Sequence, residues 1–312
     1  MSISQRSRKL VVTVIRLRAS APARQVIGVW WLACVLWSAG WLFLKVGLGD
    51  LPPLSFASLR LALAFVVLAI VVTFRNEWRA LRRADVPAIA ISGLLLLGVN
   101  YALTFWGAQF LPSALTSVLQ ATSPVFGYII GTATGVERWS FARALALPIG
   151  VAGVALVSRG QFDAGRHAGV ASVAVLGGAA SAAIAYAIVK RRAAHLPPTV
   201  LVASQTLCAL VPLGLAAAVV DGNPLALGWT PAAVVSLLYL GIASSVVAFW
   251  LNYWLLKRVS ATMVLSMALV QPLIAAVLGA LFLAERFGAA AAIGGGCVLL
   301  SAAVILRKDA AV

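Results

Sequence analysis

Long apolar runs separated by short polar connections extend from residue 27 to residue 306. A helix needs about 20 mostly apolar residues to cross a bilayer. Lipid-exposed backbone must also satisfy its hydrogen bonds within the segment, and short alternating barrel strands do not match these runs. We therefore expect an all-α integral membrane protein. The ten expected spans are residues 27–47, 54–74, 86–108, 112–133, 141–157, 169–190, 199–220, 231–255, 262–283 and 287–306.

The composition supports a membrane protein and no other class. Charged residues make up 10% of the chain and hydrophobic residues 62%, whereas a soluble domain carries about 25% charged residues. The net charge of +16 does not indicate nucleic-acid binding, because the basic residues lie between the apolar runs and form no soluble basic domain. The expected partners are the lipid bilayer and a small-molecule substrate, with no nucleic acid.

The basic residues favour one orientation. With the N-terminus inside the cell, 19 of the 24 Lys and Arg residues fall on the inner side and 4 on the outer side, while Arg60 lies within a span. Cytoplasmic loops carry such an excess. We expect a multi-pass protein of the plasma (cell inner) membrane with both termini in the cytoplasm. Residues 1–26 would form a basic tail and residues 307–312 a short C-terminal tail.

One stretch of sequence occurs twice. QATSPVFGYIIGTATGVER (120–138) matches ALVQPLIAAVLGALFLAER (268–286), and each copy is an apolar run interrupted by proline and closed by Glu-Arg. Such interruptions in corresponding places of two halves indicate the binding region of a transporter. A shift of 148 positions aligns Pro124 with Pro272, Gly131 with Gly279, and Glu137 with Glu285.

The repeat predicts two halves of opposite orientation. Residues 27–157 would form a first five-helix repeat, residues 158–168 an external linker, and residues 169–306 a second five-helix repeat. Because five is odd, the second half must enter the membrane from the other side. Inverted repeats of this kind underlie many secondary transporters, since the halves can exchange inward-open and outward-open shapes.

Several motifs resemble those of the EamA-type members of the drug/metabolite transporter (DMT) superfamily. They are WSAGWLFLK (Trp37–Lys45), PPLSFASLRLALA (Pro52–Ala64) and YALTFWGAQFLPSALTSVLQATSP (Tyr101–Pro124), together with the paired Pro-to-Glu stretches. The resemblance covers residues 27–306. It implies the ten-helix fold with two inverted five-helix repeats.

The resemblance also implies a function. Such carriers move small metabolites, often amino acids and their derivatives, usually outward. Efflux of toxic organic compounds by the same fold is the alternative, because fold does not fix substrate; a channel or a non-transport scaffold is a remote one. We expect no enzyme, cofactor or metal site, since no cluster of His, Asp or Cys is found in the sequence. A monomer and a homodimer both remain open.

The two prolines are the first candidates for the site. Proline lacks an N–H, so the carbonyl four residues earlier, on Gln120 or Ala268, loses its helical partner. An unpaired carbonyl in hydrocarbon is costly. The carbonyls freed by Pro124 and Pro272 are expected either to face a central cavity or to be satisfied by neighbouring helices at a packing kink.

Arg60 is the one charged residue well inside a span, away from its ends, about 9 Å along its helix. A charge at this depth suggests function: it would bind a substrate carboxylate, hold an interhelical contact, or extend to the outer surface. Trp37 and Trp41 share one helix face, which would line the substrate path or face lipid. Tryptophans near span ends are expected at the membrane interface: Trp30, Trp31, Trp106, Trp250 and Trp254.

Uncharged polar residues within the spans complete the expected site. As a set they would bind a polar, mostly uncharged or zwitterionic solute, or join helices. The full set of candidate substrate-binding residues is Trp37, Trp41, Arg60, Asn100, Tyr101, Thr104, Gln120, Ser123, Pro124, Gln271 and Pro272.

Small and acidic residues of the repeated stretch are candidates for gating or packing. Glycines spaced by four form a ridge that allows close helix packing. The two glutamates would cap helix ends beside Arg138 and Arg286 or take part in coupling, since no Asp or Glu lies within a span interior. These candidates are Gly127, Gly131, Gly279, Glu137 and Glu285.

Overall fold

The computed structural model describes residues 23–111, 113–157, 167–222, 228–274 and 289–310. These residues form helices joined by turns, and none of them lies in a strand. Among the described residues, six helical stretches are long and apolar enough to cross a bilayer, and shorter apolar helices accompany them. The expectation of an all-α protein is confirmed.

The first half begins with α2 (Ala23–Asp50) and α3 (Pro53–Phe74), followed by the short 3-10 turns η1 (Glu77–Ala80) and η2 (Arg83–Asp85). Its third span is one continuous helical stretch in three parts. These are α4 (Val86–Gly93), the π-helical segment η3 (Leu94–Val99) and α5 (Asn100–Phe110). It ends with α6 (Ser113–Gln120), α7 (Ser123–Ala133) and α8 (Phe141–Val157).

The second half repeats this order. It contains α9 (Ala168–Ile188) with a π-helical end η4 (Val189–Ala193), α10 (Pro198–Val220), and a third span that is again continuous. That span consists of α11 (Pro231–Leu238), the π-helical segment η6 (Tyr239–Val247) and α12 (Ala248–Leu256). It is followed by α13 (Ala261–Leu265), helical residues 267–274 and α15 (Ala289–Ala310).

Local sequence explains several of these ends. A Pro-Pro pair opens both α3 and α10, where the missing N–H has no helical partner to lose. The Asp221 carboxylate accepts a hydrogen bond from the Ser55 amide (2.6 Å) and so caps the start of α3 from the second half. Thr230 and Ser260 cap α11 and α13 with their own hydroxyls.

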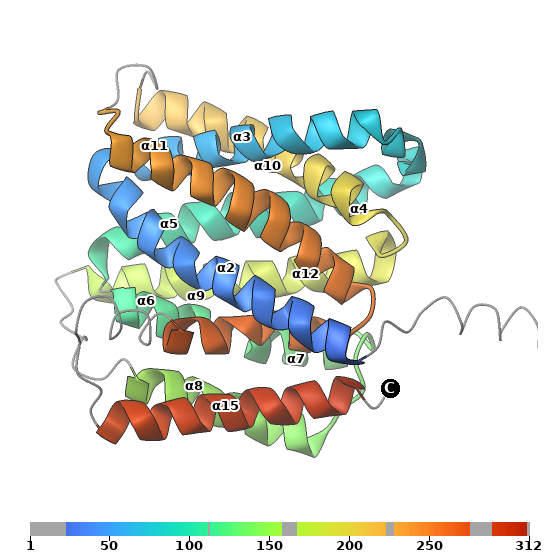
Figure 1. Ribbon diagram of the computed structural model, residues 1–312, viewed down its shortest axis with the longest axis vertical. Coiled ribbons are helices and arrows are strands. Elements are labelled where there is room, and N and C mark those ends of the chain that lie inside the picture. Colours follow the sequence, from blue (N-terminus) through green and yellow to red (C-terminus); the bar gives the residue numbers. More distant parts are fainter. Residues whose placement is uncertain (1–22, 112, 158–166, 223–227, 275–288, 311–312) are drawn as a thin grey trace, which may run out of the picture.

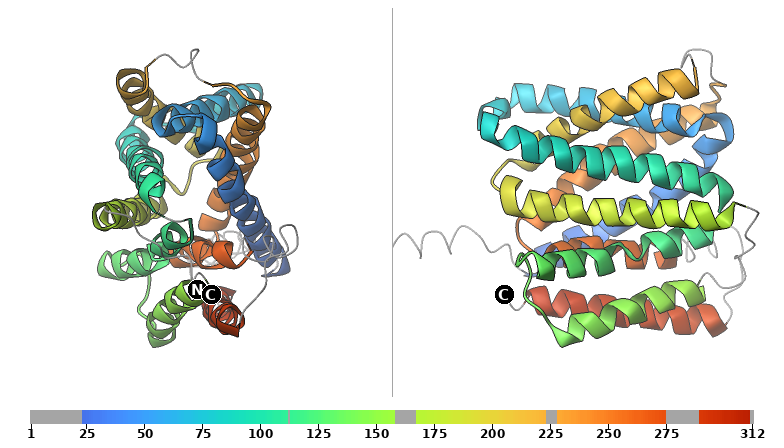
Figure 2. Two further views of the ribbon diagram at one scale, coloured as in Figure 1. Left: turned by 90° about the vertical axis from the view of Figure 1, so that its left-hand side faces the viewer. Right: turned by 180° about the vertical axis from the view of Figure 1, so that it is seen from behind.

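The two halves pack as an inverted pair. Figure 1 shows that α2 and α9, the first helices of the two halves, run in opposite directions across the bundle. Counterparts pack together: α3 lies along α10 and α8 along α15. The fourth and ninth spans also meet, with α7 packed against α13. The cross pairs also correspond, because α2 packs against α11 and α12 while α9 packs against α5. Figure 2 shows the bundle from two further sides.

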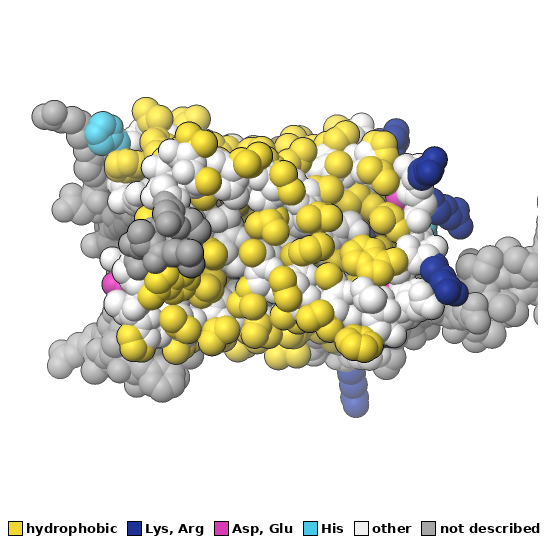
Figure 3. All heavy atoms as spheres, turned by 90° about the horizontal axis from the view of Figure 1, so that it is seen from above, with side chains coloured by type: hydrophobic (Ala, Val, Ile, Leu, Met, Phe, Trp, Pro, Cys, Tyr) yellow, Lys and Arg dark blue, Asp and Glu magenta, His cyan; other side chains and the backbone are white. Residues whose placement is uncertain are grey.

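The surface is apolar around the middle and basic at one end. Figure 3 shows hydrophobic side chains covering the flank of the bundle, with Lys and Arg gathered at one end. We call this the basic end; it carries residues 75–83, 190–192 and 257–258. Large apolar side chains such as Phe74 (88%) and Val219 (84%) are exposed, which a lipid environment accommodates.

The fourth span departs from the expectation of one continuous helix over 112–133. It is two helices, α6 and α7, separated by a turn at Ala121 and Thr122. Pro124 lies in the first turn of α7, where its missing N–H breaks no hydrogen bond. The proline therefore starts a new helix instead of kinking an existing one.

Helix α15 continues through residues 307–310 of the expected C-terminal tail. One expectation about the tryptophans is corrected. Trp30 does not face the membrane interface: it is fully buried, and its indole N–H donates to the carbonyl of Met263 (3.0 Å). Trp31 and Trp106 are exposed, in keeping with interfacial positions. The N-terminal residues 1–22 lie outside the described residues.

Close packing of α8 on α15 makes a first prediction about stability. A Cβ on Gly153 would lie 2.7 Å from the Gly294 carbonyl and 2.8 Å from Cys297 Cβ, so Gly153→Ala forces the helices apart. We expect it to destabilise the protein by about 1–3 kcal/mol. The matched control is Gly296→Ala on α15, where a Cβ meets nothing within 4 Å.

The measurement is thermal unfolding of the purified protein in detergent. Gly153→Ala should lower Tm, whereas Gly296→Ala should leave it unchanged or raise it through better helix propensity. Equal Tm values for the two variants would contradict the packing.

Candidate functional site

A cavity of about 170 Å³ lies between the two halves, near the middle of α2 and of the third and eighth spans. Its walls come from α2, α3, α5 and α6 of the first half and from α9, η6, α12 and residues 267–274 of the second. Eight sequence-predicted residues line it: Trp37, Trp41, Arg60, Asn100, Tyr101, Thr104, Gln120 and Gln271.

Arg60 is held at the edge of this cavity and does not extend to the surface. It is 6% exposed, and its guanidinium donates to the hydroxyls of Ser245 (Nε, 2.7 Å) and Ser244 (Nη2, 3.1 Å) on η6. Its Cζ also lies 4.8 Å from the centre of the Tyr101 ring. Within the described part of the chain no carboxylate forms an ion pair with Arg60. The cavity therefore contains a buried cation whose partners among the described residues are neutral.

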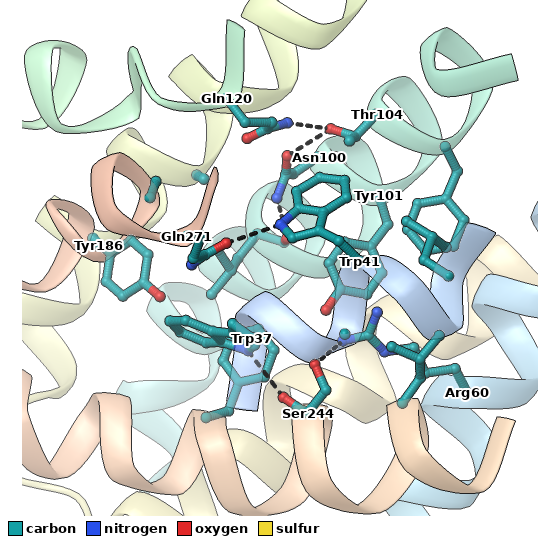
Figure 4. Close-up of a pocket in the computed structure, with 18 residues that line it drawn as sticks. Trp37, Trp41, Arg60, Asn100, Tyr101, Thr104, Gln120, Tyr186, Ser244 and Gln271 are labelled. Atoms are coloured by element: carbon teal, nitrogen blue, oxygen red, sulfur yellow. Dashed lines mark hydrogen bonds between the residues drawn. The ribbon is translucent and has the colours of Figure 1, made fainter. Parts of the chain in front are cut away.

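Two tryptophans of α2, Trp37 and Trp41, form another part of the cavity wall (Figure 4). The Trp41 indole N–H donates to the side-chain oxygen of Gln271 (3.0 Å), and the Trp37 N–H donates to the Ser244 carbonyl (3.1 Å). Both bonds join α2 of the first half to helices of the second. Of the two orientations left open by the sequence, the structure shows the cavity-lining one.

The polar side chains of α5 and α6 form a hydrogen-bonded chain. The Gln120 amide donates to the Thr104 hydroxyl (2.6 Å), which donates to the Asn100 side-chain oxygen (3.1 Å). Gly178 of α9 lies against this chain, since a Cβ there would be 2.8 Å from Thr104 Oγ1. The chain both joins helices and presents amide groups to the cavity.

Three predicted residues do not line the cavity. Ser123 and Pro124 are buried in the first turn of α7, and Pro272 is buried beside Gln271. Each proline lies close in sequence to a cavity residue, but the side chains that line the cavity are those of Gln120 and Gln271.

Sequence reasoning missed part of the lining. Tyr186 of α9 and Phe249 of α12 line the cavity, and neither was expected there from the sequence. Ser244, whose polarity within the eighth span is visible in the sequence, also lines the cavity and lies in η6. No residue pattern predicted the π-helical segments η3 and η6, which occur in corresponding spans of the two halves. π-Helical segments are frequent at functional sites, and Leu96 and Leu240 within them also face the cavity.

Glu137 connects the two halves at the basic end. Its carboxylate is buried and accepts from the Thr262 amide (2.8 Å) and the Thr262 hydroxyl (2.5 Å), with Arg143 Nη1 at 3.6 Å. It thus caps the start of α13 in the other half. Glu137 therefore has the expected role of a helix cap, and the basic side chain near its carboxylate is Arg143.

The glycines of α7 permit this contact. A Cβ on Gly127 would lie 2.3 Å from Leu265 Cδ1, and one on Gly131 would lie 3.1 Å from Glu137 Cγ. Both glycines are buried where α7 meets α13. The other two gating candidates, Gly279 and Glu285, lie outside the described residues.

The profile of the EamA-like transporter family matches this chain twice, over residues 26–159 and residues 170–307. The chain belongs to this family. It therefore has the ten-helix DMT fold of two inverted repeats and is a multi-pass membrane transporter.

Known proteins similar to this EamA-like transporter agree. The transporter YoaV of Bacillus subtilis (strain 168) is 28% identical over 81% of this chain and 86% of its own length. A "probable amino-acid metabolite efflux pump" of Escherichia coli (strain K12) is 25% identical over 82% of this chain and 86% of its own. A solved crystal structure has a TM-score of 0.76, covers 91% of this chain and 98% of its own, and at 18% identity supports the fold alone.

The groups that line the cavity can bind a solute through charge, apolar contact and hydrogen bonds. The cavity offers one guanidinium, aromatic walls, and amide and hydroxyl groups. Among the described residues no group of three or more His, Cys, Asp or Glu could hold a metal ion.

The Glu137 contact makes a second prediction. Glu137→Ala leaves the buried Thr262 amide and hydroxyl without their acceptor and removes a counter-charge from Arg143. We expect it to destabilise the protein by about 3 kcal/mol. Glu137→Gln retains an acceptor oxygen and should lose less.

Thermal unfolding in detergent ranks the three proteins. The order wild type, Glu137→Gln, Glu137→Ala, from highest to lowest Tm, supports the contact. A Glu137→Ala variant as stable as wild type would show that this carboxylate does not hold the halves together.

Proposed function

We propose that this EamA-like transporter is a secondary carrier that exports small organic metabolites, specifically amino acids or their derivatives. The observation that carries the proposal is Arg60, a buried cation at the cavity whose described partners are neutral. Burying a charge without a counter-ion is expensive, and a solute carboxylate would supply the missing charge. Arginine also suits carboxylates geometrically, because its planar donors match two oxygens.

The rest of the cavity suits the remainder of such a solute. Aromatic rings of Trp37, Trp41 and Tyr186 provide apolar contact area, and the amides of Asn100 and Gln271 provide donors and acceptors. The volume of about 170 Å³ is below the roughly 300–1,000 Å³ typical of pockets for drug-sized ligands. The size favours a small metabolite over a bulky toxic compound. The printed name of the Escherichia coli relative points the same way.

The carrier would work by alternating access with both termini in the cytoplasm. In the plasma membrane, the basic end would face the cytoplasm, since basic residues concentrate on that side of membrane proteins. Contacts between the halves close this end, among them Glu137 with Thr262 and Trp30 with Met263. Opening toward the cytoplasm would require these contacts to separate.

Counterflow in proteoliposomes tests the substrate class. The probes are radiolabelled L-phenylalanine, which has a carboxylate, and phenethylamine, which lacks it. We expect saturable exchange of L-phenylalanine only. Arg60→Gln should raise its KM about 10- to 100-fold, the loss of one charge-assisted contact. The control Arg79→Gln changes an exposed arginine of the basic end and should leave KM unchanged.

Exchange of phenethylamine in preference to L-phenylalanine would contradict the proposal and favour efflux of organic cations. Unsaturable flux of both probes would indicate a channel instead of a carrier. An Arg60→Gln variant with unchanged KM for L-phenylalanine would remove the carboxylate-binding role from Arg60.

A further inference from the structure

A second polar cluster lies buried in the membrane-spanning region, outside the cavity. It consists of Gln205 on α10, Ser92 on α4 and Tyr253 on α12, exposed by 0%, 0% and 1%. The Gln205 amide donates to the Ser92 hydroxyl (2.6 Å), and the Gln205 oxygen accepts from the Tyr253 hydroxyl. Three helices from both halves therefore meet at one side-chain amide.

This cluster lies between the cavity and the basic end. Its helices place it there: Ser92 is six residues from the start of the third span, and Tyr253 is three from the end of α12, both at the basic end. Tyr186 and Phe249 of the cavity wall separate it from the cavity, with ring centres 6.2 Å and 6.5 Å from that of Tyr253.

Gln205 occupies the place in the second half that Arg60 occupies in the first. Each is the ninth residue counted from the Pro-Pro pair that begins its helix, PPLSFASLR against PPTVLVASQ. Arg60 reaches serines of the eighth span and the ring of Tyr101 in the third. Gln205 reaches a serine of the third span and Tyr253 in the eighth. The two clusters thus use corresponding helices of the two halves, with their partner residues about one helical turn apart in the repeat register.

The backbone packing follows the same relation. Gly93 lets α4 approach α10, because a Cβ there would lie 2.7 Å from the Gln205 carbonyl. Gly241, 148 positions later, lets η6 approach α3, because a Cβ there would lie 2.5 Å from Leu63. Matching glycines thus bring the helix of Gln205 and the helix of Arg60 against their partner spans.

One acceptor beside the cluster has no partner within the part of the chain that the structure describes. Asn252 is fully buried; its amide donates to the Tyr186 hydroxyl (2.6 Å), and its oxygen accepts no hydrogen bond from the described residues. Such a group costs about 1–3 kcal/mol in a dry interior. A solute or water reaching this point with an N–H or O–H donor would remove that cost.

We propose that the Gln205 cluster, with Asn252, is a second solute-binding station, reached when the carrier opens toward the basic end. This station binds N–H and O–H groups of the solute, which donate hydrogen bonds to the side-chain oxygens of Gln205 and Asn252. This inference rests on the proposed carrier function. The alternating exchange of halves brings Gln205 to the cavity in the opposite conformation, as Arg60 lines it in the present one.

Cysteine accessibility tests the station without any solute. In a full chain whose three cysteines (Cys34, Cys208 and Cys297) are replaced by alanine, Ser92→Cys and Asn252→Cys are each exposed to the membrane-impermeant reagent 2-sulfonatoethyl methanethiosulfonate. Vesicles of both orientations are used. We expect both thiols to react from the basic-end side at least about tenfold faster than the control, because opening populates an accessible state.

The control is Ala203→Cys, a fully buried position two residues from Gln205 on the same helix, and hence on another face. Reaction of Ser92→Cys and Asn252→Cys no faster than this control would show that the cluster stays buried in every state. That result would overturn the station while leaving the proposed substrate class standing. Reaction from the opposite side only would overturn it equally.

A transport readout separates a station from a structural tie. Gln205→Leu removes the amide at similar volume. We expect KM for L-phenylalanine to rise about fivefold or more for uptake from the basic end and less than about twofold from the opposite end. A loss of folded protein with equal KM on both sides would identify Gln205 as a tie between helices and contradict the inference.

Discussion

The buried guanidinium of Arg60 is the interaction on which the account of this transporter depends. In a low-dielectric interior an uncompensated charge is costly, and serine hydroxyls and an aromatic face offset only part of that cost. The protein keeps this cation at the edge of a cavity that both halves line. In the function we propose, an anionic group of the solute would complete the site electrostatically, and we therefore expect a carboxylate-bearing metabolite to bind better than an organic cation.

Small residues and inverted pairing make that cavity possible. Glycines at 127, 153 and 178 let helices approach so closely that an added Cβ would clash, and the helices therefore pack tightly at these three points. The Trp41–Gln271 and Glu137–Thr262 bonds cross from one half to the other. In the proposed carrier these contacts would form and break as the open side changes.

Much of the fold could be predicted from the sequence, because bilayer thickness fixes the length of an apolar helix. The α8 bounds agree with the expected span, and most others agree within a few residues. The fourth span differs, and the end of the ninth lies outside the described residues. Arg60 could be found because a lone charge within a span is conspicuous. The break between α6 and α7 was harder to predict, since a proline is compatible both with a kink and with the start of a new helix.

Other features had no signal along the chain. Tyr186 stands in an alanine-rich run and becomes part of the cavity only through the packing of α9 on α5. No residue pattern indicated the π-helical segments η3 and η6. Trp30 was expected at the interface because it lies near a helix end, yet it is fully buried and donates a hydrogen bond to the Met263 carbonyl. For Tyr186 and Trp30 the deciding partner is distant in sequence.

Equilibrium binding tests the central claim most directly. Isothermal titration calorimetry of the purified transporter would compare L-phenylalanine with L-phenylalaninamide, which lacks the carboxylate, in wild type and in Arg60→Gln. The account predicts that wild type binds the acid at least about tenfold more tightly than the amide and that the variant loses this difference. Equal affinity for the two ligands in wild type, or a preference that persists in Arg60→Gln, would contradict it.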